Sequence, residues 1–204
     1  AEHNNKELKS STLSTITAAS QIDENIEVLI IGFDCAQVSN ELKNIKLVKK
    51  IIEVNNDKYK NPIAELFTPV INTLAENYTH IMAPASTFGK NIMPRLAAIL
   101  DVSQVSDIIK VESPDTFIRP IYAGNALATV QSTDSKKIIT VRATSFEPAL
   151  SEGGNAEIEK LEFNSEINIT EFINREENKS DRPELGTARV VISGGRGLGS
   201  QENF

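Results

Sequence analysis

The chain ends on a glycine-rich loop whose residue types could bind an anion. In "ARVVISGGRGLGS", strand-forming residues lead directly into Gly194, Gly195, Gly197 and Gly199, with Arg196 among them. Consecutive glycines let backbone N–H groups converge on an anion, and an arginine adds a planar positive charge. The residues favour a binding loop around Gly195, Arg196 and Gly197, and an exposed glycine turn is an equal alternative.

The catalytic forms of such a loop do not fit these residues. The dinucleotide fingerprint needs a glycine where Ser200 stands, and a P-loop needs Lys-Ser/Thr where Ser200 and Gln201 stand. The loop of ATP pyrophosphatases, "SGGxDS", has Asp and Ser where this chain has Gly197 and Leu198. What remains is a strand, a glycine turn and one cation.

A second candidate loop lies in "APASTFGKNIMPR", residues 83–95. It follows a predicted strand and precedes a predicted helix, which is where α/β folds bind ligands. Ser86, Thr87 and Lys90 could hold a phosphate there, which makes an adenine-nucleotide-binding or hydrolysing domain the alternative function. The favoured interpretation is that Ser86 or Thr87 caps the helix and Lys90 is solvated.

The remaining reactive residue types are few. Cys35 is the only cysteine, which excludes disulfides and CxxC motifs, and no histidine accompanies it in sequence to activate a thiolate. With only His3 and His80 besides, a zinc site of nitrogen and sulfur ligands is not expected. His80 precedes a buried strand and is interpreted as structural.

Charge and hydropathy narrow the class of protein. Residues 151–184 carry ten acidic and four basic side chains, a balance of −6 out of the chain's net −7. A nearly neutral body with an acidic connector argues against nucleic-acid binding, which needs a basic face. No apolar run approaches the roughly 20 residues of a membrane span, and no targeting signal is visible, so no membrane insertion is expected.

Elements that would position these loops alternate along the chain. Helical periodicity alternates with short, continuous apolar runs, a pattern typical of βαβ units and a mostly parallel, doubly wound sheet. The expected strands are residues 27–33, 49–54, 79–84 and 106–112, and the expected helices are 11–22, 36–45, 62–77 and 90–101, with Pro94 near the first turn of the last helix.

The pattern changes after residue 112. Residues 116–124, 126–132 and 136–144 follow one another through short turns and are predicted to form an added antiparallel β meander. We therefore predict three parts: an N-terminal α/β domain over 1–150, an acidic linker or surface excursion over 151–188, and the first strand and glycine turn of a second, truncated domain over 189–204. Because doubly wound domains begin with a strand, we expect one strand before Ala1.

Several segments together resemble the α subunits of electron transfer flavoproteins in order and spacing. They are "AEHNNKELKSSTLSTITAAS", "THIMAPASTFGKNIMPRLAA", "SPDTFIRPIYAGNALATV", "VRATSF", "SDRPEL", "ARVVISGGRGL" and "ENF". The resemblance covers essentially the whole chain. It implies an adenine nucleotide α hydrolase-like first domain and the start of an FAD domain in residues 189–204.

The resemblance also implies a function. In that family an α/β-subunit heterodimer carries one FAD, takes electrons from acyl-CoA and other dehydrogenases of fatty acid β-oxidation, and passes them to a membrane quinone oxidoreductase. This chain would be an electron-carrier fragment that serves mainly as a scaffold for the β subunit and binds little or no FAD by itself. The compartment would be the bacterial cytoplasm or, in a eukaryote, the mitochondrial matrix.

By position, Arg196 matches the family's arginine beside the isoalloxazine, where a positive charge favours the reduced flavin. Gly195 and Gly197 are weaker flavin-contact candidates on the same loop. Gly199 replaces a common lysine and Gln201 a glycine, so no role is assigned to those two positions. The loop at residues 85–91 resembles a fixed element of the first domain, for which packing or subunit contact is the expected role.

Overall fold

The structure is a computed structural model of the 204-residue chain, and it divides into two units, Ala1–Asn174 and Arg175–Phe204. It describes all residues except 165–168, 177–184, 186–187 and 189. Among the described residues, none of the helices combines the length and hydropathy that a bilayer-spanning helix needs. Each unit is described by itself below.

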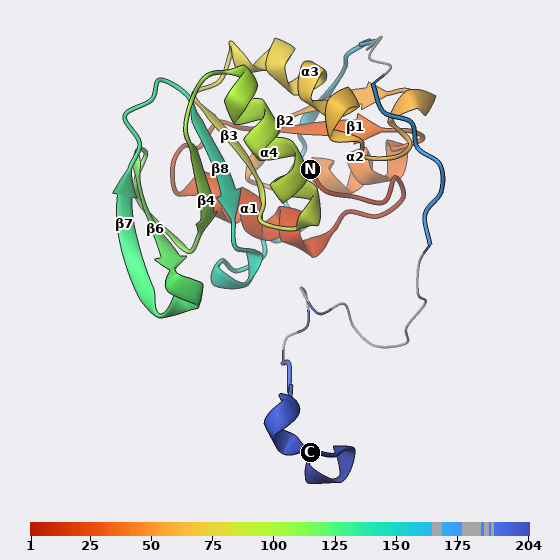
Figure 1. Cartoon of the computed structure of the whole chain (residues 1–204). Helices are drawn as coiled ribbons and strands as arrows, with labels where there is room; N and C mark the ends of the chain where they lie inside the picture. Colours follow the sequence, from red (N-terminus) through yellow and green to blue (C-terminus); the bar gives the residue numbers. More distant parts are fainter. Residues whose placement is uncertain (165–168, 177–184, 186–187, 189) are drawn as a thin grey trace. The chain divides into compact units, whose positions relative to one another are not determined.

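Helices and strands alternate through the first two thirds of the first unit (Figure 1). They are α1 (Ser10–Ser20), β1 (Ile26–Gly32), α2 (Ala36–Lys43), β2 (Val48–Asn55), α3 (Ala64–Ala75), β3 (His80–Pro84), α4 (Thr87–Ile99) and β4 (Gln104–Ile108). Five strands follow: β5 (Lys110–Ser113), β6 (Thr116–Ile121), β7 (Ala126–Gln131), β8 (Lys137–Val141) and β9 (Glu157–Lys160).

The strands form three small sheets. β1–β2–β9 and β3–β8–β4 are parallel, and β5–β6–β7 is antiparallel. The predicted α/β class, a mostly parallel sheet with an added antiparallel meander, is confirmed. The apolar run from Val28 to Ile31 in β1 suits parallel pairing, because a strand covered by helices on both faces has no solvent side.

Two helical layers cover opposite faces of the parallel strands. Val28 of β1 packs with Ile16 of α1 and Leu42 of α2. Ile31, which points to the other face of the same strand, packs with Phe67 of α3. Figure 1 shows α3 and α4 together on one side of these strands.

The composition of the meander differs from the prediction. Residues 137–141 form β8, which lies between β3 and β4 as a parallel strand and is not part of the antiparallel sheet. All of β8 after Lys137 is buried, which is the environment of a central parallel strand. The third meander strand is instead β5, because the predicted strand over 106–112 is divided into β4 and β5.

Pro94 lies in the interior of α4, and the prediction that it stands near the first turn was wrong. The helix begins at Thr87 because Ser86 caps it, which places Pro94 two turns further along. Proline removes one helical hydrogen bond, and here the residue is exposed, so water can solvate the freed carbonyl of Lys90.

Part of the acidic segment belongs to the first sheet. Within 151–188, β9 pairs with residues Lys50–Glu53 of β2, and Ala156 just before it is buried. The hydroxyl of Tyr59 donates to the backbone oxygen of Phe163 at 3.4 Å, which holds the chain after β9 against the body. The segment up to Phe163 thus packs with the first unit, and the assignment of 151–188 as an acidic linker or surface excursion stays a prediction.

The second unit contains two short 3-10 turns, Arg196–Leu198 and Gln201–Asn203. Residues 190–195 form neither helix nor strand, and Val190 and Ile192 are more than two thirds exposed. A strand needs a neighbour to pair with, and the described residues supply none at this position. The assignment of 189–204 to the start of a second domain therefore stays a prediction.

Candidate functional site

Arg196 begins a one-turn 3-10 helix on the glycine loop and is exposed. The turn is closed by the N–H of Leu198 bonding to Gly195 O at 3.0 Å and that of Gly199 to Arg196 O at 3.1 Å. A side chain added at Gly195 or Gly197 would meet no heavy atom within 4 Å. The loop therefore presents open backbone and one exposed cation.

The second candidate loop is a helix cap. Ser86 Oγ accepts a hydrogen bond from the Gly89 N–H at 3.4 Å, and Lys90 is exposed. A Cβ at Gly89 would lie 1.9 Å from the carbonyl oxygen of Pro84, so α4 packs directly on the end of β3. The favoured capping interpretation is confirmed, and the loop serves packing.

His3 and Asn5 pack together at the carboxyl end of β1, which the sequence patterns did not reveal. The Sγ of Cys35 donates to Asn5 Oδ1 at 3.5 Å, and the Asn5 N–H donates to His3 Nδ1 at 3.0 Å. A Cβ at Gly32 would lie within 2.4–2.7 Å of these three side chains. No sequence motif links residues 3 and 5 to residue 35; only folding brings them together.

The protonation of this cluster argues against catalysis at neutral pH. Burial, then the positive charge of the α-amino group, lowers the pKa of His3 to about 4. Burial, then the nearby Glu53 and Asp34 carboxylates, raises the pKa of Cys35 to about 11. Cys35 is thus a thiol and His3 a neutral imidazole, and the described residues contain no group of His, Cys, Asp and Glu suited to a metal ion.

His80 is held at both ring nitrogens, as a structural histidine would be. Its Nε2 lies 2.6 Å from Pro114 O and its Nδ1 2.9 Å from the hydroxyl of Thr79. The contact with Pro114 ties β3 to the turn between β5 and β6. The sequence-based interpretation is consistent with this geometry.

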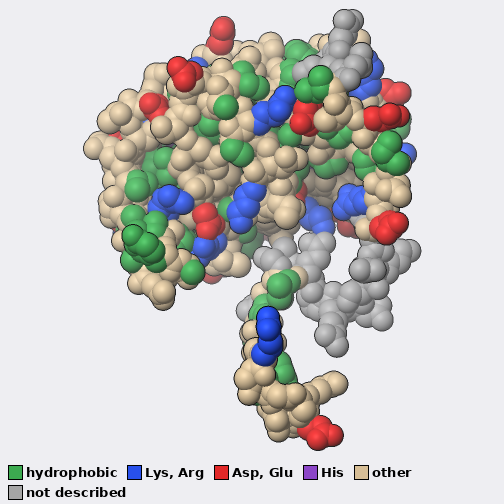
Figure 2. Space-filling view, in the orientation of Figure 1, with side chains coloured by type: hydrophobic (Ala, Val, Ile, Leu, Met, Phe, Trp, Pro, Cys, Tyr) green, Lys and Arg blue, Asp and Glu red, His purple; other side chains and the backbone are tan. Residues whose placement is uncertain are grey.

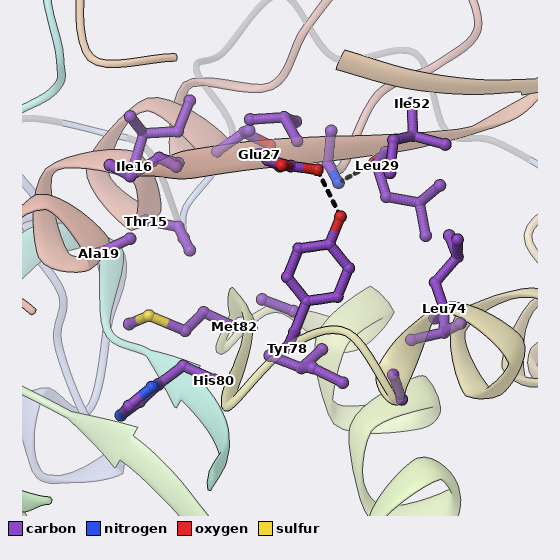
Figure 3. Close-up of a pocket in the computed structure, with 18 of the residues that line it drawn as sticks. Thr15, Ile16, Ala19, Glu27, Leu29, Ile52, Leu74, Tyr78, His80 and Met82 are labelled. Atoms are coloured by element: carbon purple, nitrogen blue, oxygen red, sulfur yellow. Dashed lines mark hydrogen bonds between the residues drawn. The ribbon is translucent and has the colours of Figure 1, made fainter. Parts of the chain in front are cut away.

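A cavity of about 530 Å³ separates β1 from β3. Figure 3 shows Tyr78 reaching across it to Glu27, to whose carboxylate the phenol donates a hydrogen bond. Burial, then this carboxylate, raises the pKa of Tyr78 above its usual value, so the hydroxyl remains protonated. Most of the other lining side chains are apolar, and they come from β1 and β3 as well as from α1, α3 and α4.

The turn after β6 presents an exposed apolar patch formed by Tyr122 and Leu127. Tyr122 is 77% exposed and Leu127 of β7 is 62% exposed, and Figure 2 shows hydrophobic side chains gathered at the β6–β7 end of the face in view. Tyr122 and Ala123 both have left-handed backbones, with φ of 49° and 55°. Such a conformation costs on the order of 1–3 kcal/mol for a residue other than glycine and is concentrated at functional sites.

Elsewhere on the face shown in Figure 2, basic and acidic side chains are interspersed. No basic stripe of the kind that tracks a phosphate backbone is visible on that face. This distribution agrees with the nearly neutral charge balance outside residues 151–184.

Comparison with known proteins gives a consistent picture. Residues 1–166 match the electron transfer flavoprotein domain family. The whole chain is 47% identical over 204 residues to the electron transfer flavoprotein subunit alpha of Pseudomonas aeruginosa and 45% identical over 221 residues to the mitochondrial subunit alpha of Dictyostelium discoideum. It is 42% identical over 207 residues to a probable mitochondrial subunit alpha of Caenorhabditis elegans. The chain spans 66%, 62% and 62% of the lengths of these three relatives.

Proposed function

We propose that this chain, which belongs to the electron transfer flavoprotein family, provides the scaffold on which an α subunit and a β subunit assemble around FAD. The observation that carries the proposal is the match to α subunits over the full 204 residues. The site geometry supports it, because the cluster at the end of β1 has pKa values far from neutrality. In this proposal the chain contributes to an electron carrier and is not an enzyme by itself.

The flavin, when bound in the whole protein, supplies the redox chemistry. The described residues that fit it are Arg196, with Gly195 and Gly197 leaving the backbone open beside that cation. Arg196 would place a fixed positive charge at the flavin and so favour its reduction. One open turn buries little of a ligand's surface, whereas cofactor sites bury most of it, so this chain alone is proposed to bind FAD weakly or not at all.

The proposed physiological role is the transfer of electrons from acyl-CoA and other dehydrogenases through FAD to a membrane quinone oxidoreductase. The proposed compartment is the bacterial cytoplasm or the mitochondrial matrix, since relatives come from bacteria and from mitochondria. We do not expect the protein to bind nucleic acid.

The scaffold proposal predicts that the chain binds the β subunit but does not retain FAD. The purified 204-residue chain is expected to retain far less than one FAD per chain, yet to capture the β subunit in a one-to-one complex. Flavin absorbance after gel filtration and sedimentation of the mixed subunits measure the two properties. Stoichiometric FAD in the isolated chain would refute the scaffold role.

We place part of the β-subunit contact on the patch of Tyr122 and Leu127, because it is exposed, apolar and held by strained backbone. Changing both residues to serine is expected to weaken β-subunit binding at least tenfold, since buried aromatic anchors dominate interface energies. The matched control is Ile99→Ser, which removes another exposed apolar side chain (48% exposed) from α4. Equal affinities of the double variant and the control would remove the patch from the interface.

Arg196 is testable in the full-length heterodimer. An Arg196→Ala substitution is expected to lower the flavin midpoint potential by tens of millivolts, because it removes a positive charge that favours the reduced flavin. For a two-electron couple, 30 mV corresponds to about 1.4 kcal/mol. Arg196→Lys serves as the control that keeps the charge. Spectroelectrochemical titration decides: an unchanged potential in the alanine variant contradicts the role given to Arg196.

A further inference from the structure

β7 forms one outer edge of the antiparallel sheet, and Figure 1 shows it as the outermost strand of that sheet. Among the described residues it pairs with β6 alone, through six residues in an unbroken register. The backbone groups on its other side therefore form a free edge that is open to a further strand. The sequence of β7, "ALATVQ", contains no charged residue and no proline that would discourage such an addition.

Other outer strands of the structure do carry charges. β5, on the opposite side of the same sheet, contains Lys110 and Glu112, which form an ion pair at 2.7 Å. β9, the outer strand of the first parallel sheet, is charged at three of its four positions. Charged side chains keep an edge from pairing with another chain. The contrast indicates that the free edge of β7 is suited to strand addition.

The register of β7 identifies which of its backbone groups face the free edge. The N–H of Ser132, just after β7, donates to Asp115 O at 2.8 Å, and these two residues continue the register of the β6–β7 pair. Residues that bond to a given neighbour alternate along an antiparallel strand. Counting back from Ser132, the N–H and C=O groups of Leu127, Thr129 and Gln131 therefore point away from β6, to the free edge.

The side chains beside the free edge favour an apolar partner. Leu127 is 62% exposed, and the turn before β7 presents Tyr122, which is 77% exposed and has a left-handed backbone. Thr129 and Gln131 are exposed and uncharged. Cross-strand neighbours are the side chains that stabilise a sheet. A strand that pairs here is therefore expected to be uncharged, with an apolar side chain opposite Leu127.

A second copy of this chain fits the free edge less well. Two identical strands pair antiparallel about a two-fold axis, and the residues that face the shared edge must oppose one another. In the two registers of greatest overlap, centred on Ala128 or on Thr129, Leu127 opposes Thr129 or Gln131. Neither register gives Leu127 an apolar partner.

We propose that the free edge of β7 receives an uncharged, antiparallel strand of about six residues from the β subunit, which extends the β5–β6–β7 sheet across the interface. The length follows from β7, and the direction follows from the pairing within this sheet. The occupant follows from position, because the edge continues the patch of Tyr122 and Leu127. The inference rests on the proposed function, and it adds backbone hydrogen bonds to the contact between the subunits.

Hydrogen exchange detected by NMR tests the pairing residue by residue. The 204-residue chain is compared with and without the β subunit. On binding, the amides of Leu127, Thr129 and Gln131 are expected to exchange about tenfold more slowly or less, because they gain acceptors. The amides of Ala128 and Val130, which already bond to β6, are expected to change less. Unchanged exchange at the three outward amides would overturn the proposal.

A proline substitution provides the second arm. Thr129→Pro removes an N–H that faces the free edge and leaves the bonds to β6 in place, whereas the matched control Thr129→Ser keeps this N–H. The proline variant is expected to bind the β subunit about tenfold more weakly than the serine variant, because a backbone acceptor of the partner loses its donor. Sedimentation of the mixed subunits measures both affinities.

The outcomes separate this inference from the proposed function. Equal affinities of the proline and serine variants would overturn the strand pairing and leave the scaffold role intact. A parent chain that binds no β subunit would refute both. A parent chain that dimerises by itself, and does so less with Thr129→Pro, would assign the edge to a second copy and overturn the proposal. Should Thr129→Pro fail to fold, the exchange pattern of the unsubstituted chain decides.

Discussion

Gly89→Ala is expected to destabilise the first unit by about 3 kcal/mol, which corresponds to a Tm lower by roughly 10 °C. An added Cβ would lie 1.9 Å from the carbonyl oxygen of Pro84. That carbonyl has little room to move, because Pro84 pairs with Val141 and the next N–H, of Ala85, bonds to Val141 O at 2.7 Å. Urea unfolding followed by far-UV circular dichroism measures the loss.

The sign of the stability change in Gly89→Ala distinguishes the effect of helix propensity from the effect of the collision with β3. Helix propensity alone predicts that alanine stabilises an interior helical position by roughly 0.5–1 kcal/mol relative to glycine. The collision with β3 predicts a larger change in the opposite direction. Asn91→Ala, two residues further along α4 and exposed, is the matched control and is expected to be neutral or slightly stabilising. A Gly89→Ala protein as stable as the parent would show that α4 can move away from β3.

The free energy of unfolding is expected to fall by about 2–3 kcal/mol between pH 6.5 and pH 4 through His3 alone. Burial lowers the pKa of His3 from 6.5 to about 4 in the folded protein. Between these values the unfolded chain binds a proton that the folded chain does not, so stability rises with pH across this window and is constant above it. Protonation also removes the acceptor at Nδ1 that the Asn5 N–H uses.

Carboxylates also change protonation in this pH range, so the contribution of His3 is measured as the difference between the parent and a variant that lacks His3. Urea unfolding at pH 4.5, 5.5, 6.5 and 7.5 is compared between the parent and His3→Asn, whose amide oxygen can replace the Nδ1 acceptor without titrating. The variant is expected to show a shallower loss of stability at low pH than the parent. Parallel curves for the parent and His3→Asn would mean that His3 is solvated in the folded chain.

The periodicity of the sequence predicted most of the first unit, for a physical reason. Runs such as residues 28–33 are apolar at consecutive positions, which suits strands buried between two helical layers. The same signal is present in β8, where Ile138, Ile139, Thr140 and Val141 are all buried. The short turn before β8 suggested a meander instead. Local turn chemistry specifies that the chain reverses, but not which sheet the next strand enters.

Site residues could be predicted from the sequence where they contact residues nearby in the chain, but not where their contacts form only on folding. A helix cap at Ser86 or Thr87 was predictable because a cap bond joins residues only three apart, and the structure assigns it to Ser86. The cluster of His3, Asn5 and Cys35 was not recognised, because Cys35 is 30 residues from Asn5 and meets it only when the start of the chain packs along β1. The pKa values of His3 and Cys35 follow from that burial and carry no signature in the sequence.

By itself, the sequence determined the α/β class and the resemblance to electron transfer flavoprotein α subunits. It also indicated Arg196 of the glycine loop as a flavin contact, which stays a prediction. These depend on periodicity and residue order, which are local properties. Only the tertiary structure decided that β8 lies between β3 and β4, that Gly89 must lack a side chain, and that residues of β1 and β3 line one cavity. Each of these depends on distances between segments far apart in the chain, which packing sets and local pattern does not encode.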